Sequence, residues 1–444
     1  MPNKVDFNKD YPGIEKSNFY YKRALGLIPS VTQTLAKGPS QYVNGASPKY
    51  LVKGKGARVW DVDGNEFIDY NMGIGPLSLG YAYPKVDQAI KRQLEDGITF
   101  SLMHPLEVEV AELMRDVIPN AEAVRYSKVG ADVTTAAIRL ARAYTNKNKI
   151  LCCGYHGWHD WYVSVTARNH GIPEAIQNLS FTFPYNNIDA FKNAIDDDVA
   201  AVILEPVVFE EPKDDFLHKV AKICEDKGIV LIFDEMWTGF RMALGGAQEY
   251  FGITPDLATY SKAVANGMPI SMLTGKRKIM DLAENDIFFY TTFGGEALSL
   301  AAAKATIEEI KDKNVPKYLA EKGKILKDGY NSIANKLGID YTSATGYNFR
   351  SLITFSDKAG NPLELKSLVQ QEMIKRGILW QGFHNMSFSH NDADIQYTLK
   401  VYEEVLPILK KAVEQNNVKE LLRGTPVQPV FRKTSDFDTK PVKK

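Results

Sequence analysis

Residues 231–241 read LIFDEMWTGFR, and this stretch decides the fold. An apolar run over 229–233 leads straight into Asp234 and Glu235, and a Trp-Thr-Gly turn then leads to Arg241. An apolar run without alternation is typical of a strand that is buried on both faces of a parallel sheet. A carboxylate at the end of such a strand costs free energy unless a positive group meets it. The stretch therefore predicts a ligand site at the end of a buried strand.

Working outward, strand-like and helix-like patterns alternate from about residue 122. Apolar strands are expected in AVRYSK, KILCCGY, LSFTFPY, VAAVILEP, IVLIFDE, LATYSKA and ISMLTG, with helices at 131–145, 214–227 and 295–313. This alternation indicates an α/β fold whose mostly parallel sheet is covered on both faces. Long helices and few strands in the final third favour a smaller α+β domain. The predicted domains are 1–83 (arm and hairpin of the small domain), 84–315 (large domain), 316–420 (small domain) and 421–444 (extended tail).

The N-terminal part has its own local signals. One short helix is expected near residues 15–27, and amphipathic helices at 84–97 and 104–118. ARVWDVDGNEFIDY (57–70) alternates around Asp63-Gly64, which predicts a hairpin with a type I′ turn.

Composition excludes several function classes. Lys+Arg and Asp+Glu both total 54 in 444 residues, so the formal net charge is zero and no nucleic-acid partner is expected. The three cysteines cannot form a disulfide framework and are expected to be reduced. The N-terminus lacks the apolar core of a signal peptide, and no apolar run is long enough to span a membrane. We therefore expect a cytoplasmic protein without a membrane partner or a metal site.

Ligands of open parallel sheets bind at the carboxyl ends of the strands. The predicted strands deliver to that edge Asp234, Lys262, Tyr155 with His156, Glu205, and Gly130 at a helix start. Taken singly, each residue has a simpler interpretation. Asp234 could cap a helix, Lys262 could be a solvated charge, Tyr155 could be an aromatic of the core or surface, and Gly130 could belong to a turn. Together they match pyridoxal 5′-phosphate (PLP), in which a lysine holds the aldehyde and an aspartate keeps the pyridine nitrogen protonated. An aromatic side chain stacks on the ring, and amide groups at a helix N-terminus bind the phosphate.

The segment FDEMWTGFRMALGGAQEYFGITPDLATYSKAVANGMPIS resembles the core signature of the class III (subgroup II) PLP-dependent aminotransferases. Within this class the chain is most similar to the glutamate-1-semialdehyde 2,1-aminomutases. The likeness covers about residues 28–420 and includes YHG, ILEP and TTFGGEALSLAAA. It implies PLP fold type I, the architecture of aspartate aminotransferase.

The resemblance also implies roles for single residues. Lys262 resembles the Schiff-base lysine and Asp234 the pyridine-nitrogen partner, and both would be catalytic. Tyr155 would stack on the ring, and Met236, two residues beyond Asp234 on the same strand face, would press on the other side. The further expected cofactor contacts are Gly130, Ala131, His156, Glu205 and Thr292. Thr292 resembles a threonine that reaches the phosphate of the neighbouring subunit's cofactor, which implies a homodimer with shared sites. Apart from the resemblance, strand alternation turns Glu235 to the side opposite Asp234, so we expect a structural role for it, with Arg241 as a candidate partner.

Three departures from the family pattern affect the expectations. The phosphate loop over 128–132 lacks two hydroxyl donors, which predicts weaker cofactor retention unless Lys128 turns inward to compensate. Lys37 replaces a substrate-binding arginine, and Ile74 replaces a tryptophan of the pocket wall, so the pocket should be larger. An aromatic stretch follows YHG where the aminomutase has a flexible gating loop that traps its intermediate.

These departures favour a transaminase that moves an amino group between an amino donor and a carbonyl acceptor by a ping-pong aldimine/pyridoxamine mechanism. Lys37 and Arg350 are candidate carboxylate anchors, and Trp158 and Glu210 are candidate contacts for a bulky or sugar-like substrate. The simpler interpretation is that Trp158 packs under the loop and that Glu210 is solvated. The alternatives are an intramolecular aminomutase of the glutamate-1-semialdehyde type, a non-catalytic PLP-fold scaffold and a PLP-dependent decarboxylase.

Overall fold

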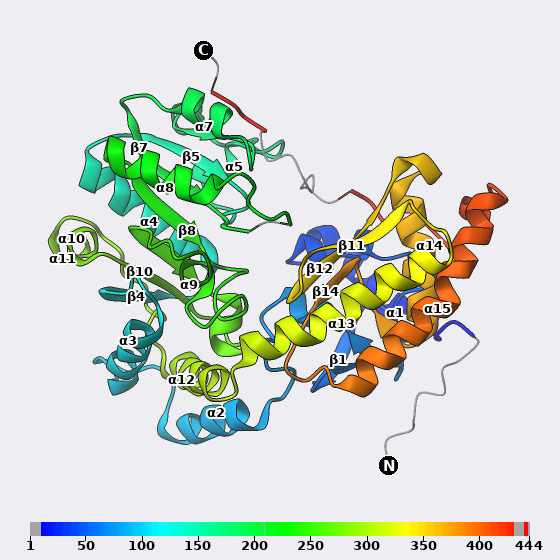
Figure 1. The fold of residues 1–444 in the computed structure, drawn as a ribbon. Helices are drawn as coiled ribbons and strands as arrows, with labels where there is room; N and C mark the ends of the chain where they lie inside the picture. Colours follow the sequence, from blue (N-terminus) through cyan, green and yellow to red (C-terminus); the bar gives the residue numbers. More distant parts are fainter. Residues whose placement is uncertain (1–9, 208, 430–438, 443–444) are drawn as a thin grey trace. The chain divides into compact units, whose positions relative to one another are not determined.

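The computed structural model describes residues 10–207, 209–429 and 439–442. The chain divides into two compact units (Figure 1). Unit 1 comprises residues 1–83 and 317–433, and unit 2 comprises residues 84–316 and 434–444. The fold of each unit follows from its own strands and helices.

Unit 2 is built on a seven-stranded sheet with the order β4-β10-β9-β8-β7-β5-β6. Its strands are β4 (Ala123–Ser127), β5 (Lys149–Cys153), β6 (Ser180–Thr182), β7 (Val199–Leu204), β8 (Val230–Asp234), β9 (Leu257–Tyr260) and β10 (Ser271–Gly275). The five strands from β9 to β6 run parallel, and β10 is antiparallel to both of its neighbours. The predicted mostly parallel sheet is thereby confirmed.

Helices bury this sheet. Every residue of β7 and of β8 is buried, as their unbroken apolar sequences predict. The long helices of unit 2 are α2 (Pro84–Asp96), α3 (Pro105–Val117), α4 (Gly130–Thr145), α8 (Phe216–Lys227) and α12 (Ala297–Asp312), and α4 packs against β7, β8, β9 and β10. Its shorter helices are α5 (Asp160–Val163), α6 (Glu174–Gln177), α7 (Ile188–Ala194), α9 (Gly246–Phe251), α10 (Arg277–Met280), α11 (Leu282–Asn285) and η5 (Lys262–Ala265). The helices predicted in this part of the chain are confirmed to within two residues.

Unit 1 contains two small sheets, ordered β1-β2-β3-β13 and β11-β12-β14. Their strands are β1 (Leu51–Lys55), β2 (Arg58–Asp61), β3 (Glu66–Asp69), β11 (Thr342–Tyr347), β12 (Arg350–Phe355), β13 (Ile378–Leu379) and β14 (Phe383–Asn385). The helices are α1 (Glu15–Leu25), α13 (Val315–Lys336, which starts in unit 2), α14 (Pro362–Lys375) and α15 (Asp392–Glu414). Single-turn helices are η1 (Pro29–Val31), η2 (Leu35–Lys37), η3 (Pro39–Gln41), η4 (Met72–Ile74), η6 (Asp357–Ala359) and η7 (Val418–Leu421).

The predicted hairpin is confirmed, but its predicted type I′ turn is wrong. Strands β2 and β3 pair antiparallel and are joined by the four residues 62–65. Of these, Gly64 has a positive φ of 94° and Asp63 does not, whereas a type I′ turn needs two such residues. The Asp61 carboxylate instead accepts the Asp63 and Asn65 N–H groups and so orders a longer loop.

The predicted extended tail is described in two pieces. Val427 is buried, and its N–H donates to the Ser367 hydroxyl at 3.0 Å within unit 1. In unit 2, the Thr182 N–H donates to the Lys440 carbonyl at 2.8 Å, so this piece lies beside the edge strand β6. Residues 430–438 and 443–444 of the predicted tail lie outside the described residues.

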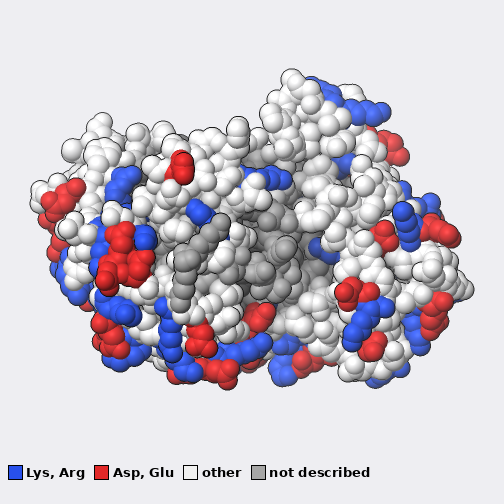
Figure 2. Space-filling view, turned by 90° about the horizontal axis from the view of Figure 1, so that it is seen from above, with Lys and Arg blue, Asp and Glu red and all other residues white. Residues whose placement is uncertain are grey.

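Acidic and basic side chains are interspersed on the face drawn in Figure 2, in keeping with the zero net charge. Within the described ranges, no helix is both long enough and apolar enough to cross a membrane. The three cysteines are free and buried.

Candidate active site

The residues singled out on unit 2 meet at one edge of its sheet. Asp234 ends β8 and is in register with Thr259 of β9, and Lys262 follows β9 by two residues. Tyr155 and His156 follow β5, and Glu205 follows β7 directly. Because β5, β7, β8 and β9 are parallel, their carboxyl ends share this edge.

Asp234 is buried and held by His156. The His156 Nδ1 lies 2.7 Å from Asp234 Oδ2, and both side chains are at most 2% exposed. The Met236 N–H donates to the other carboxylate oxygen at 3.1 Å. His156 Nε2 is buried and has no hydrogen-bond partner within the described residues. A carboxylate accepts up to about four hydrogen bonds, so Asp234 can take a further donor such as a protonated pyridine nitrogen.

A tight turn sets the position of Tyr155. The Tyr155 N–H donates to Glu205 Oε1 at 2.7 Å, and Glu205 is buried. Gly154 has a φ of 114°, and a Cβ there would lie 2.8 Å from Glu205 Cγ, so only glycine fits. Tyr155 as a whole residue is 39% exposed, and the Tyr162 ring lies edge-on with its centre 5.4 Å from that of the Tyr155 ring. This aromatic face is therefore accessible to a planar ligand.

Trp237 contacts the candidate lysine, and the sequence analysis missed it. The Lys262 Nζ lies 4.4 Å from the centre of the Trp237 ring, and the Arg241 guanidinium lies 5.4 Å from the same ring. Trp237 is only 8% exposed, so the Lys262 amine is placed by a buried aromatic surface. Its place in the sequence, in the turn directly after the strand that ends at Asp234, could have indicated Trp237 as a site residue.

The N-terminus of α4 offers two amide groups to a ligand. In the part of the chain that is described, the N–H groups of Gly130 and Ala131 donate to no acceptor. A Cβ at Gly130 would lie 3.0 Å from the Met236 sulfur, and a Cβ at Gly157 would lie 2.7 Å from the Ala131 Cβ. The turn after β5 and the turn after β8 therefore both pack against this helix end. The two N–H groups at the helix end fit a bound phosphate.

The charges beside this helix end are already paired. Asp132 Oδ2 accepts the Ser127 hydroxyl at 2.6 Å and the Val129 N–H at 3.1 Å. The Lys128 ammonium lies 2.7 Å from Glu296 Oε1; burial lowers the pKa of Lys128, and Glu296 offsets part of that shift. The Lys128 charge is therefore paired with Glu296, and its expected compensating role at a phosphate stays a prediction.

Two local expectations are wrong. The strand ends at Asp234, so Met236 lies in the following turn, and its side chain contacts Gly130 at the α4 end. Glu235 does not pair with Arg241. Its Oε2 accepts the Ala247 N–H at 2.9 Å and its Oε1 the Gln248 N–H at 3.0 Å, both from α9. Arg241 donates instead to the carbonyl of Trp237 at 2.9 Å.

The aromatic stretch after YHG is anchored to α4. Trp161 is buried, and its Nε1–H donates to the Thr135 hydroxyl at 2.9 Å. The His159 Nδ1 lies 2.7 Å from the same hydroxyl, and the Tyr162 hydroxyl donates to the Gly154 carbonyl at 2.8 Å. Trp158 projects outward and is 70% exposed.

The remaining predicted site residues belong to other segments of the two units. Glu210 is exposed on the loop after β7, 3.4 Å from the Lys213 ammonium. Thr292 is exposed in the segment before α12. Lys37 and Arg350 belong to unit 1, where Lys37 ends η2 and is exposed, and the Arg350 guanidinium lies 5.2 Å from the Phe383 ring centre. Among the described residues, no cluster of three or more histidines, cysteines or carboxylates could hold a metal ion.

Comparison with known proteins identifies relatives of this arrangement. The family model described as aminotransferase class III matches residues 42–387. The chain is 34% identical to 3-aminobutyryl-CoA aminotransferase of Cloacimonas acidaminovorans over 411 residues, which cover 90% of this chain and 98% of the relative. It is 35% identical to glutamate-1-semialdehyde 2,1-aminomutase of Fusobacterium nucleatum, covering 86% and 95%. A solved structure of the PLP internal aldimine form of FumI from Sphingopyxis sp. MTA144 matches with a TM-score of 0.82 and 28% identity, covering 90% and 97%.

Proposed function

This chain belongs to the class III aminotransferases, which are PLP-dependent enzymes, and we propose that it is a two-substrate transaminase. An amino donor would leave its amino group on the cofactor, and a carbonyl acceptor would then take it. The intramolecular aminomutase is the alternative, because relatives of both kinds match nearly the whole chain.

The residues at the sheet edge fit the cofactor. We assign Lys262 as its covalent anchor and as the base and acid that moves the substrate proton. Asp234, positioned by His156, would hold the proton at the pyridine nitrogen. When bound, PLP supplies an electron sink for the bonds at the substrate's reacting carbon.

The other assigned contacts surround the ring and the phosphate. Tyr155 and Met236 would face the ring, and the amide groups of Gly130 and Ala131 would bind the phosphate. Glu205 would act through the backbone N–H of Tyr155, which it holds at 2.7 Å.

One observation carries the choice of a two-substrate reaction. The aminomutase pattern has a flexible gating loop after YHG, whereas here Trp161, His159 and Tyr162 fasten that stretch by hydrogen bonds. A fastened stretch cannot close over an intermediate and retain it. The product of the first half-reaction would therefore leave and a different acceptor would enter.

The test uses protein reconstituted with pyridoxamine 5′-phosphate. Offered glutamate-1-semialdehyde alone, an aminomutase isomerises it without releasing the diamine intermediate, whereas a two-substrate transaminase releases the diamine and leaves the cofactor as PLP, which an amino donor must convert back. Isomerisation without any released diamine would overturn the proposal. The Lys262→Ala variant should lose both turnover and the visible absorbance of the lysine-bound cofactor. A variant that still turns over would remove Lys262 from its role.

Finer features of the reaction are part of the same proposal. Lys37 and Arg350 would bind carboxylate groups of the donor or acceptor. Trp158, 70% exposed, and Glu210 would contact a bulky or sugar-like acceptor. The likeness to 3-aminobutyryl-CoA aminotransferase supports a large substrate. Screening carbonyl acceptors for the return of the visible cofactor absorbance would identify it.

We further propose a cytoplasmic homodimer with shared sites. Exposed Phe288, Tyr290 and Phe293 flank Thr292 on unit 2, and an exposed apolar group of this kind favours burial against another chain. Thr292 would then reach the cofactor phosphate of the neighbouring subunit. A monomeric mass in light scattering at micromolar concentration would contradict this assignment.

A further inference from the structure

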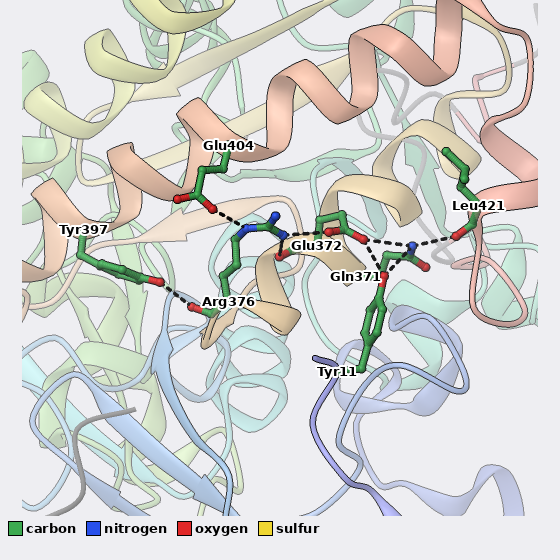
Figure 3. Close-up of polar contacts among 7 residues, drawn as sticks. All are labelled: Tyr11, Gln371, Glu372, Arg376, Tyr397, Glu404 and Leu421. Atoms are coloured by element: carbon green, nitrogen blue, oxygen red, sulfur yellow. Dashed lines mark hydrogen bonds and ion pairs between the residues drawn. The ribbon is translucent and has the colours of Figure 1, made fainter. Parts of the chain in front are cut away.

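Two groups of polar contacts fasten segments that lie outside the sheets. In unit 1, the Tyr11 hydroxyl donates to Glu372 Oε1 at 2.5 Å (Figure 3). The Gln371 side-chain amide donates to the Leu421 carbonyl at 2.9 Å. These contacts tie residues before α1 and after α15 to helix α14. The second group ties residues 439–442 to unit 2, where the partners are the edge strand β6 and the segment before it.

Lys440 pairs with β6 through its backbone. Its N–H donates to the Thr182 hydroxyl at 2.7 Å, and its carbonyl accepts the Thr182 N–H at 2.8 Å. Thr182 and Pro441 form a parallel bridge, and β6 is the last strand in the order of the sheet. The segment therefore extends the sheet at an edge, where backbone groups are otherwise available to any extended chain.

Side chains of the segment make further contacts beside the strand. The Lys440 ammonium donates to the carbonyl of Gln177, the last residue of α6, and such a carbonyl has no partner inside its own helix. The same ammonium lies 5.2 Å from the centre of the Phe181 ring. The Thr439 hydroxyl donates to the Val165 carbonyl. Backbone pairing alone would need none of these contacts, so they indicate recognition of particular side chains.

The surface that receives these side chains is held in place by its own hydrogen bonds. The Gln177 amide donates to the Ile172 carbonyl at 2.8 Å, and the Asn169 amide donates to Gln177 Oε1 at 3.3 Å. Val165 and Thr182 are at most 4% exposed. A surface that is already ordered loses little conformational entropy when a peptide binds to it.

Pro441 limits the pairing to one added strand. Both backbone groups of Lys440 point toward Thr182, so those of the next residue point away from β6. Pro441 is exposed and has no N–H to offer on that outer side. The order Thr-Lys-Pro therefore supplies a hydroxyl donor, an ammonium and a residue that discourages further strand pairing.

We propose that β6, together with Val165 and Gln177, is a peptide-recognition site of unit 2 for an extended Thr-Lys-Pro sequence, and that residues 439–441 are its resident, detachable ligand. In place, they cover the strand edge and fasten the segment over 165–177, which follows the aromatic stretch anchored to α4. Released, they leave an open edge that the same sequence on a separate peptide enters by strand addition. The proposal does not depend on the transamination reaction, because its contacts involve none of the residues assigned to the cofactor.

The first test follows hydrogen exchange in the full-length, PLP-loaded protein by mass spectrometry with fragmentation to single residues. The reporter is the Thr182 N–H, whose acceptor is the Lys440 carbonyl. Lys440→Met removes the ammonium and should speed exchange at Thr182 at least about tenfold, as expected for the loss of a hydrogen bond from a charged group. Lys192→Met, at an exposed position on α7 of the same unit, is the matched control and should exchange at the native rate. An unchanged rate in Lys440→Met would overturn the proposal.

The second test supplies the ligand as a separate molecule. A synthetic peptide with the sequence of residues 439–444 is added at millimolar concentration to the Lys440→Met protein. We expect this peptide to restore the protection of Thr182, and the same peptide carrying Lys440→Met to restore none. No protection by the native sequence, or equal protection by both peptides, would show that the site does not recognise the lysine and that the inference is wrong. Neither test measures transamination, so a negative result in either leaves the proposed function intact.

Discussion

Replacing Glu235 by glutamine should change how the stability of the protein depends on pH. The Glu235 carboxyl is buried and accepts hydrogen bonds from the N–H groups of Ala247 and Gln248 and from the Thr238 hydroxyl. Burial raises its pKa from 4.5 to about 7; those hydrogen bonds oppose part of the rise, and the nearby Asp234 adds to it.

The two pKa values, 4.5 in the unfolded chain and about 7 in the folded protein, give the magnitude and the sign. A difference of about 2.5 pKa units corresponds to about 3.4 kcal/mol. Between pH 4.5 and about 7 the folded protein retains a proton at Glu235 that the unfolded chain has released. The free energy of unfolding therefore falls as the pH rises through this window. Glutamine does not titrate, so this contribution of about 3 kcal/mol is absent from the Glu235→Gln variant.

The assay is urea unfolding of native and variant protein at several pH values from 4.5 to 8. We expect the stability of Glu235→Gln relative to the native protein to increase by about 3 kcal/mol across this range. Glu112→Gln, an exposed position on α3, controls for the loss of one negative charge. Parallel pH profiles of the Glu235→Gln variant and the native protein would refute the reasoning.

Two further predictions concern the cofactor site. Val129→Ser restores a hydroxyl at the start of α4 and should tighten PLP binding about tenfold, measured by equilibrium dialysis against the exposed control Val108→Ser; equal affinities would contradict a phosphate at this helix end. Trp237→Phe weakens the contact with the Lys262 ammonium and favours the neutral amine. Acetylation of Lys262 in the cofactor-free variant should therefore be about threefold faster by mass spectrometry, and an unchanged rate would show that Trp237 does not place the amine.

The sequence predicted the large sheet because its strands carry their own signals. Apolar runs without alternation, bounded by helical patterns, indicated parallel strands buried on both faces, and β7 and β8 are buried throughout. The rule for strand ends then grouped Asp234, Lys262 and Tyr155 at one edge. These inferences depend on periodicity and on the order of elements, which are local properties of the chain.

Partners of individual side chains could not be predicted in the same way. Glu235 was expected to meet Arg241, six residues away, but it binds the amide groups of α9. Lys128 pairs with Glu296, 168 residues further along the chain. Both outcomes depend on which elements pack beside the strand ends. The local sequence around Glu235 or Lys128 does not indicate these partners.

By itself, the sequence determined the sheet, the family resemblance and the acid and lysine at the strand ends. Only the tertiary structure decided that His156 holds Asp234, that Trp237 lies under Lys262, and that Lys440 pairs with β6. The physical reason is the range of the interactions. Backbone periodicity is set by neighbours a few residues apart, whereas a buried charge is satisfied by whichever distant segment the packing brings within about 3 Å.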